Sequence, residues 1–284
     1  MPQVKFETAK GLYQKAGKGI RFEASKENQI IPTTVLYGKD GLSTGVDPYQ
    51  QGTTQLFPLG TRLYYGDREY KYVKMGAGAV TAGKLVASPA HDGNFVNKAI
   101  ANLDAGTLAA ITFSNGATAD AKSFSHAIGS RAIIFGNAGA TDLAKDDFAE
   151  GYILINNEEG EGQFLRIRTH EAMDQSDRAN VVIETYDPLT TALVKASSLA
   201  TLIKHPCSEV VVAPTTFAGA LVGVTVRDMS ANNYGWVVCK GLSSLLADGT
   251  VVIGENVVRS DGTAGSAEPA PDDVTAIVGR VHLV

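Results

Sequence analysis

The stretch YKYVKMGAGAVTAGKLVAS, from Tyr70 to Ser88, decides the fold class because its order of residue types returns near the C-terminus. The stretch YGWVVCKGLSSLLADGTVVIGENVVRS, from Tyr234 to Ser260, again gives an alternating strand with aromatic residues, a glycine, a spacer, a tight turn and an apolar strand. The turns are Ala82-Gly83 in the first stretch and Asp248-Gly249 in the second. Glycine accepts the positive φ that hairpin turns demand, so both stretches predict hairpins.

A nucleotide-binding P-loop is the competing interpretation of the first stretch. Gly78 is followed, after four residues, by Gly83 and Lys84, which is one residue short of the P-loop spacing. Leu85 stands where a Ser or Thr hydroxyl should hold Mg²⁺, and Pro89 would stop the helix that has to follow. The spacing therefore favours a turn between strands, and we expect no nucleotide or other cofactor.

The composition predicts an all-β protein. A third turn of the same kind lies at Ala105-Gly106, within LDAGTLAAITF. Hydrophobic residues make up 44% of the 284 residues, charged residues only 19%, and there are 30 glycines. Short runs of Val, Ile, Thr, Tyr and Phe broken by Gly, Asn and Asp are typical of many short strands. The helix candidates are 121–130 and 191–204, both short and weakly capped.

Charge and hydropathy limit the partners. A formal net charge of -5 argues against a protein that coats nucleic acid, which needs clustered Lys and Arg. The first residues, MPQVKFETAKGLYQKAGKG, lack the apolar core of a signal peptide, so we expect synthesis in the cytoplasm. The longest uncharged run, 210–226, is short for a membrane span and contains Pro and Gly. We interpret it as buried strands joined at APTT, with no membrane partner.

The order of patterns predicts two small β-barrel or β-sandwich domains. Residues 49–99 plus 201–284 form one β-barrel domain, because the two similar stretches lie there. Residues 100–200 form an inserted β domain whose strands include YILI and FLRIR, joined by the acidic turn NNEEGEG. A tandem arrangement in which one domain follows the other stays open. Near the C-terminus we expect an exposed loop over 260–273 and a final strand that closes a sheet.

Residues 1–48 are predicted to be an extended N-terminal arm. The segment between Glu7 and Glu23 contains no acidic residue, and the arm shows no sustained helical stripe. Such a segment gains little by packing on itself, so a larger surface would order it. The alternative is a ragged edge strand on the protein's own sheet. The residues predicted to meet an acidic surface are the basic ones: Lys10, Lys15, Lys18 and Arg21.

The usual residues of catalysis give no recognisable site, and we expect no enzyme activity. Histidines occur singly, without metal-ligand or nucleophile spacing, at His91, His126, His170, His205 and His282. An acidic cluster lacks the spacing of a calcium loop, and solvated turns explain it as well as a cation does; it comprises Asp146, Asp147, Glu158, Glu159 and Glu161. The two cysteines, Cys207 and Cys239, are expected to be buried free thiols. We predict no metal site.

Two groups of aromatic residues are candidates for contact with a partner. Tyr234 and Trp236 share a face if their segment is a strand, either as core aromatics or as an interface anchor. Tyr64, Tyr70 and Tyr72 share parity and would form a carbohydrate-binding face if the strand continued through Gly66-Asp67.

Five stretches together carry a resemblance to virion structural proteins of tailed bacteriophages. They are FPLGTRLYYGDREYKYVKMGAGAVTAGKLV, DDFAEGYILINNEEGEGQFLRIRTH, VVVAPTT, NNYGWVVCKGLSSLLADGTVVIGENVVRS and IVGRVHLV, which span most of the chain from about Phe57 to Val284. Within that group the chain most resembles capsid decoration, or cement, proteins. The matches are patterns of Gly, aromatic and Val positions and contain no catalytic signature.

The resemblance implies a location on the outer capsid surface of a virion. Proteins of this group clamp neighbouring major capsid protein subunits, usually as a homotrimer at local three-fold positions. The alternatives are a phage tail or fibre-anchoring protein and a carbohydrate-binding β protein.

Overall fold

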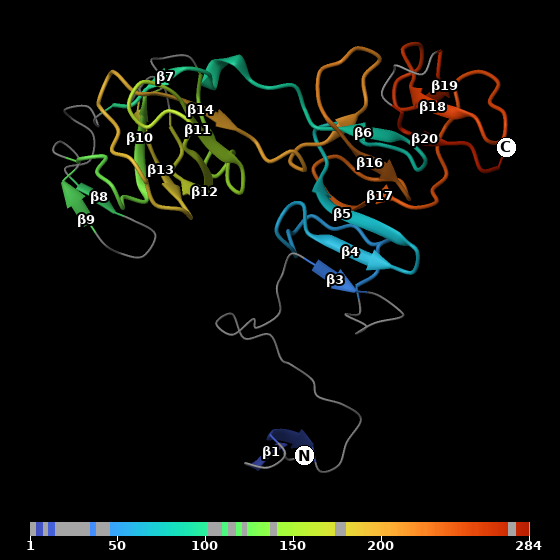
Figure 1. Cartoon of the computed structure of the whole chain (residues 1–284), viewed down its shortest axis with the longest axis horizontal. Coiled ribbons are helices and arrows are strands. Elements are labelled where there is room, and N and C mark those ends of the chain that lie inside the picture. Colours follow the sequence, from blue (N-terminus) through green and yellow to red (C-terminus); the bar gives the residue numbers. More distant parts are fainter. Residues whose placement is uncertain are drawn as a thin grey trace. The chain divides into compact units, whose positions relative to one another are not determined.

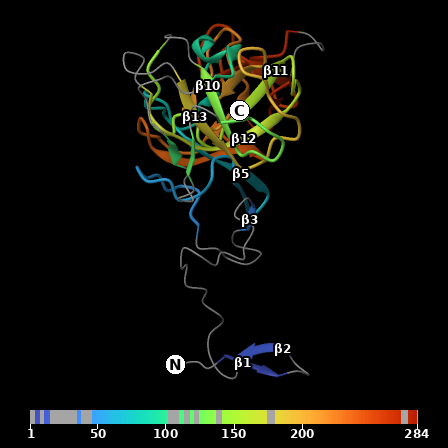
Figure 2. The same ribbon diagram turned by 90° about the vertical axis from the view of Figure 1, so that its left-hand side faces the viewer.

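The computed structural model describes the backbone of residues 4–7, 11–14, 35–37, 46–101, 110–112, 118–120, 124–136, 141–173, 180–271 and 277–283. The chain divides into two compact units, Met1–Thr33 and Thr34–Val284. The first unit contains the antiparallel strands β1 (Val4–Glu7) and β2 (Gly11–Gln14), which lie side by side in Figure 2. All the other strands belong to the second unit.

The second unit contains a seven-stranded sheet that draws on both ends of the sequence (Figure 1). Its order is β15-β6-β16-β17-β5-β4-β3, with every neighbouring pair antiparallel except β3 and β4. The strands are β3 (Val35–Tyr37), β4 (Arg62–Tyr65), β5 (Arg68–Lys74), β6 (Leu85–Ala87), β15 (Val211–Val212), β16 (Leu221–Thr225) and β17 (Tyr234–Lys240). β3, which lies within the predicted arm 1–48, is an edge strand of this sheet.

Apolar side chains pack in a cluster on each face of this sheet, so both faces are buried. In β5, Tyr70 and Tyr72 contribute to a cluster with Trp236, whereas Val73 contributes to a second cluster with Val237. Neighbouring residues of a strand point to opposite faces, so β5 and β17 each supply both clusters. The predicted all-β class is confirmed.

Between β6 and β15 the chain builds a six-stranded antiparallel sheet of order β10-β13-β12-β11-β14-β7. Its strands are β7 (Lys98–Ala99), β10 (Ala132–Gly136), β11 (Tyr152–Asn157), β12 (Phe164–His170), β13 (Asn180–Thr185) and β14 (Leu199–Ile203). A bridge between Ile100 and Phe135 joins the two edges, and the Ala101 N–H donates to the Ile134 carbonyl at 3.0 Å. The sheet therefore forms a nearly closed barrel, and its strands run from Lys98 to Ile203 where the sequence suggested 100–200.

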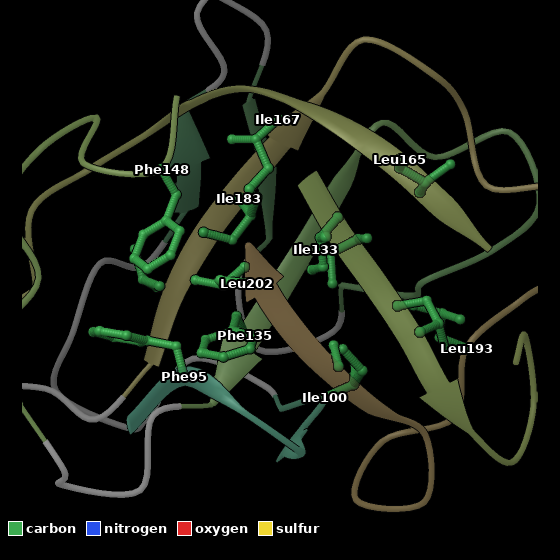
Figure 3. Packing of buried hydrophobic residues seen from close by; sticks show 14 of the residues in the cluster. Phe95, Ile100, Ile133, Phe135, Phe148, Leu165, Ile167, Ile183, Leu193 and Leu202 are labelled. Atoms are coloured by element: carbon green, nitrogen blue, oxygen red, sulfur yellow. The ribbon is translucent and has the colours of Figure 1, made fainter. Parts of the chain in front are cut away.

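The barrel encloses one apolar core. The side chains of Ile133 and Phe135 from β10, Ile183 from β13 and Leu202 from β14 converge in its interior (Figure 3). All four are fully buried. The predicted hairpin through NNEEGEG is confirmed, because β11 and β12 pair antiparallel on either side of it.

The remaining elements are short. They are the hairpin β8 (Ala110–Thr112) and β9 (Thr118–Asp120), the three-stranded sheet of β18 (Asn256–Arg259), β19 (Ala267–Pro269) and β20 (Gly279–Arg280), and the 3₁₀ turn η1 (Gly93–Phe95). The Asp92 side chain caps η1 by accepting from the Asn94 N–H.

The two glycine turns do not connect hairpins, so that prediction is wrong. Gly83 and Gly249 have positive φ values of 74° and 81°, as turns require. However, β5 pairs with β17 and β4, while β6 pairs with β16 and β15. The second turn likewise lies between β17 and β18, which belong to different sheets. Pairing with strands distant in sequence is therefore preferred over pairing between the two strands that flank the turn. The third turn, 105–106, lies outside the described residues.

The helix candidates are wrong wherever the structure describes them. Residues 124–130 contain no helix, and 191–204 contains turns followed by β14. β14 pairs with β11 on one side and β7 on the other, and these ladders outweigh local helix propensity.

The C-terminal region follows the sequence expectation in part. β20 pairs with β18, as expected of a final strand. The stretch 260–273 is not simply an exposed loop, because it contains β19 and the buried residues Ser260 and Ser266. Ser260 Oγ donates to Asp248 Oδ2 at 2.6 Å and accepts from the Thr263 N–H at 2.9 Å, which ties the start of the stretch to the turn at Asp248.

Candidate functional site

The predicted capsid-binding residues of the arm, Lys10, Lys15, Lys18 and Arg21, lie outside the described residues. In the first unit, Met1–Thr33, the described residues form the β1–β2 hairpin. Its register pairs Phe6 with Leu12 and Lys5 with Tyr13. An isolated two-stranded hairpin is at best marginally stable in water. Contact with another surface would therefore stabilise this one.

Trp236 is a core residue of the seven-stranded sheet. Its side chain is 3% exposed, and its ring centroid lies 5.0 Å from that of Tyr72 and 5.5 Å from that of Phe57. Tyr234 stacks on Tyr72 from the same face, at 6.1 Å between centroids. The shared face of Tyr234 and Trp236 is confirmed, and the core alternative describes the position of Trp236. The interface role of the pair stays a prediction.

The tyrosines proposed for a sugar-binding face do not form one. Gly66-Asp67 is the turn between β4 and β5, so the strand does not continue. Tyr70 is fully buried and Tyr72 is 3% exposed, and burial raises the pKa of the Tyr70 phenol to about 12. An aromatic platform for a sugar ring needs exposed faces, which these two side chains do not offer.

Three histidines are structural hydrogen-bond acceptors. His126 Nε2 accepts from the Ile134 N–H at 3.0 Å, and His170 Nε2 accepts from the Phe148 N–H at 3.0 Å. His205 Nδ1 accepts from the Cys207 N–H at 3.1 Å. Only a neutral imidazole offers an acceptor nitrogen. Burial lowers the pKa of His126 and of His205 to about 4, and it also lowers the pKa of His170.

The acidic cluster is divided among separate contacts. Asp146 Oδ1 accepts from the Thr169 hydroxyl at 2.5 Å and from the His170 N–H at 3.0 Å. Asp147 pairs with Lys204, whereas the three glutamates belong to the turn between β11 and β12. Among the described residues, no group of three or more His, Cys, Asp or Glu is placed to hold a metal ion. Cys207 is a buried free thiol and Cys239 a half-buried one.

Several exposed apolar residues lie between positions 242 and 283 of the chain, and sequence analysis missed them. We call the following set the C-terminal apolar residues: Leu242, Leu246, Val252, Ile253, Ile277 and Leu283, all more than two-fifths exposed. The Gly254 N–H donates to the Val281 carbonyl at 2.9 Å, which places the turn bearing Ile253 beside the terminal segment. Exposed apolar residues that lie side by side mark contact surfaces more often than single exposed residues do. The sequence TVVIGENVV is typical of a buried strand. Its pattern does not show that Val252 and Ile253 are exposed whereas Val257 and Val258 are buried.

No family model, curated protein sequence or solved structure matches this chain. In the part of the chain that the structure describes, no helix has the length and apolar character needed to cross a bilayer.

Proposed function

We propose that this chain is a structural virion protein that decorates a bacteriophage capsid from outside and clamps adjacent major capsid protein subunits. The observation that carries the proposal is the separate N-terminal unit, Met1–Thr33, whose described strands form only a two-stranded hairpin. Residues 1–33 contain six Lys and Arg residues but only three Glu and no Asp. A basic segment that is marginally stable alone is suited to bind an acidic partner surface.

In this proposal the chain acts by adhesion. A protein that binds the assembled shell better than its free subunits stabilises the assembled state by mass action. Contact across a joint between subunits adds buried area there and so opposes pressure from packaged DNA. The sequence resemblance described above supports the capsid as the place of binding.

Removing residues 1–33 is expected to reduce occupancy on the capsid by about tenfold or more, because the arm would supply a large share of the contact. The deletion ends at Thr33 because β3 begins at Val35 and pairs with β4 in the seven-stranded sheet. The measurement is cryo-electron microscopy of capsids reconstituted with either form of the protein.

The control is the circular dichroism and thermal unfolding of the truncated chain, which should match those of the full chain. Equal occupancy of the two forms would refute the arm's role. Density confined to the tail or portal would move the protein to the tail or fibre-anchoring alternative.

A homotrimer is part of the same proposal. The C-terminal apolar residues could pack in a subunit interface, and β20 lies at the edge of its sheet among the described strands, where a strand of another subunit could pair with it. The substitution Ile253→Lys places a charge on a side chain that is 63% exposed, so it should weaken association without disturbing the fold.

Analytical ultracentrifugation tests the trimer. The full chain is expected to sediment as a trimer at micromolar concentration, and the Ile253→Lys variant as a smaller species. Phe164→Lys, at a 52% exposed position on the barrel, is the matched control and should leave the trimer intact. A wild-type chain that remains monomeric both in solution and on capsids would contradict the homotrimer.

A further inference from the structure

Two segments connect the six-stranded barrel with the seven-stranded sheet. The chain enters the barrel through 88–97, between β6 and β7, and leaves it through 204–210, between β14 and β15. Domains joined by short connections move relative to each other unless further contacts hold them. The contacts at this joint therefore decide whether the barrel is fixed.

Glu150 of the barrel binds the segment that precedes β4. Its Oε2 accepts from the buried Leu59 N–H at 2.5 Å, and its Oε1 accepts from Gln55 Nε2 at 2.6 Å. Arg166 Nη2 lies 3.7 Å from the same carboxylate, and the Glu150 side chain is only 20% exposed. Leaving a buried peptide N–H without an acceptor costs free energy, so the Glu150 carboxylate stabilises the contact between the barrel and this segment.

A row of alternating charges crosses the joint beside Glu150. Lys204 Nζ lies 2.9 Å from Asp147 Oδ1 in the barrel and 2.7 Å from Glu209 Oε2 near β15. Lys74 Nζ, at the end of β5, lies 3.8 Å from the other oxygen of Glu209. Burial by itself would lower the pKa of Lys204, but hydrogen bonds to Glu209 and Asp147 outweigh it and raise that pKa. Lys204 is therefore held as a cation between two carboxylates.

The exit segment is also packed against both sides of the joint. The ring of His205 lies 6.3 Å from that of Tyr152 in the barrel, with an interplanar angle of 23°. On the other side, a Cβ added to Gly60 would lie 2.8 Å from His205 Cε1, and Gly60 has a φ of 77°. The Lys74 N–H donates to the Cys207 carbonyl at 2.9 Å, which anchors the segment to β5.

We infer that Glu150 and the row Asp147-Lys204-Glu209 form a latch that holds the inserted barrel in one orientation on the seven-stranded sheet. The latch draws on both domains and on the exit segment. Releasing it frees the barrel to swing on its two connections while each sheet keeps its own core. This inference is independent of the capsid proposal, since it concerns the orientation of the barrel alone.

The test compares Glu150→Ala with Glu171→Ala. Glu171 is the matched control because it also forms an ion pair in the barrel, with Lys145 at 3.1 Å, but that pair is exposed and stays within the barrel. Spin labels at Ile128→Cys in the barrel and Leu221→Cys in β16, both exposed positions, report the distance between the two domains in a Cys239→Ser background. The wild type and Glu171→Ala should give one narrow distance distribution. Glu150→Ala should give a distribution at least about twice as broad.

Hydrogen exchange distinguishes release of the latch from unfolding. In Glu150→Ala, exchange of the Leu59 amide should accelerate by about tenfold or more, while amides of the barrel core such as Ile153 keep their protection. Lys204→Met serves as a second variant in case Glu150→Ala does not fold, and it should broaden the same distance distribution. Distance distributions in both folded variants as narrow as in the wild type would overturn the inference. Equal loss of protection at Leu59 and Ile153 would overturn it as well.

Discussion

Lowering the pH from 7 to 5 is expected to reduce the free energy of unfolding of the full chain by about 4 kcal/mol, about 2 kcal/mol from each of two imidazoles. His126 is buried and His205 is half-buried, and their pKa values fall from 6.5 to about 4 on folding. For His205 the nearby charges of Arg166 and Lys71 add to the effect of burial. Because each ring accepts a backbone N–H, protonation would also remove a hydrogen bond.

The sign follows from the order of the two pKa values. Between pH 6.5 and about 4 these two imidazoles bind protons in the unfolded chain but not in the folded chain. The free energy of unfolding therefore falls as the pH falls through this window. The contribution is complete above pH 6.5. Denaturant titrations at pH 7, 6 and 5 measure it.

The substitution His126→Gln isolates one of the two groups. The glutamine carbonyl can accept from the Ile134 N–H but does not titrate, so the variant should lose about 2 kcal/mol of the pH dependence. An unfolding free energy that is the same at pH 5 and pH 7 would contradict the prediction, as would an unchanged pH dependence in the variant.

Phe135→Ala is expected to lower the free energy of unfolding by about 3–5 kcal/mol, the usual cost of removing a buried phenylalanine ring. Phe135 is fully buried in the barrel core, and its backbone also forms the bridge to Ile100 that closes the barrel. The loss combines transfer of apolar surface with the cavity left behind. Chemical denaturation followed by circular dichroism gives the value.

Phe164→Ala is the matched control for this substitution. Phe164 is 52% exposed and stacks on Tyr152 at 4.5 Å between ring centroids, so its removal should cost about 1 kcal/mol. Equal losses at the two positions would mean that the barrel does not bury Phe135 as described.

Local signals predicted the fold where the partners are local. The hairpin through NNEEGEG follows from an alternating strand on each side of a turn that contains Gly160 and Gly162, both with φ of 86°. The turn at Gly83 also needs glycine, yet the strands on its two sides pair elsewhere. A turn signal fixes the local backbone but does not choose the strand partner, which depends on which apolar faces meet.

The candidate site was predictable to a smaller extent. The aromatic pair Tyr234 and Trp236 was recognised from its parity, because both residues lie in one strand. The contacts of Glu150 had no comparable signal, since the carboxylate binds a backbone N–H about ninety residues away in sequence. Basic residues of the arm were identified by composition alone, and composition does not specify a partner.

The insertion of the barrel between β6 and β15 sets an order of events during synthesis. β5 cannot pair with β17 until the ribosome has made residues 234–240, because their register joins Tyr72 to Trp236. By then every strand of the barrel, which ends at Ile203, has already been made. The barrel can therefore form first and bring the two halves of the seven-stranded sheet close together, which shortens the effective loop that the long-range pairing has to close.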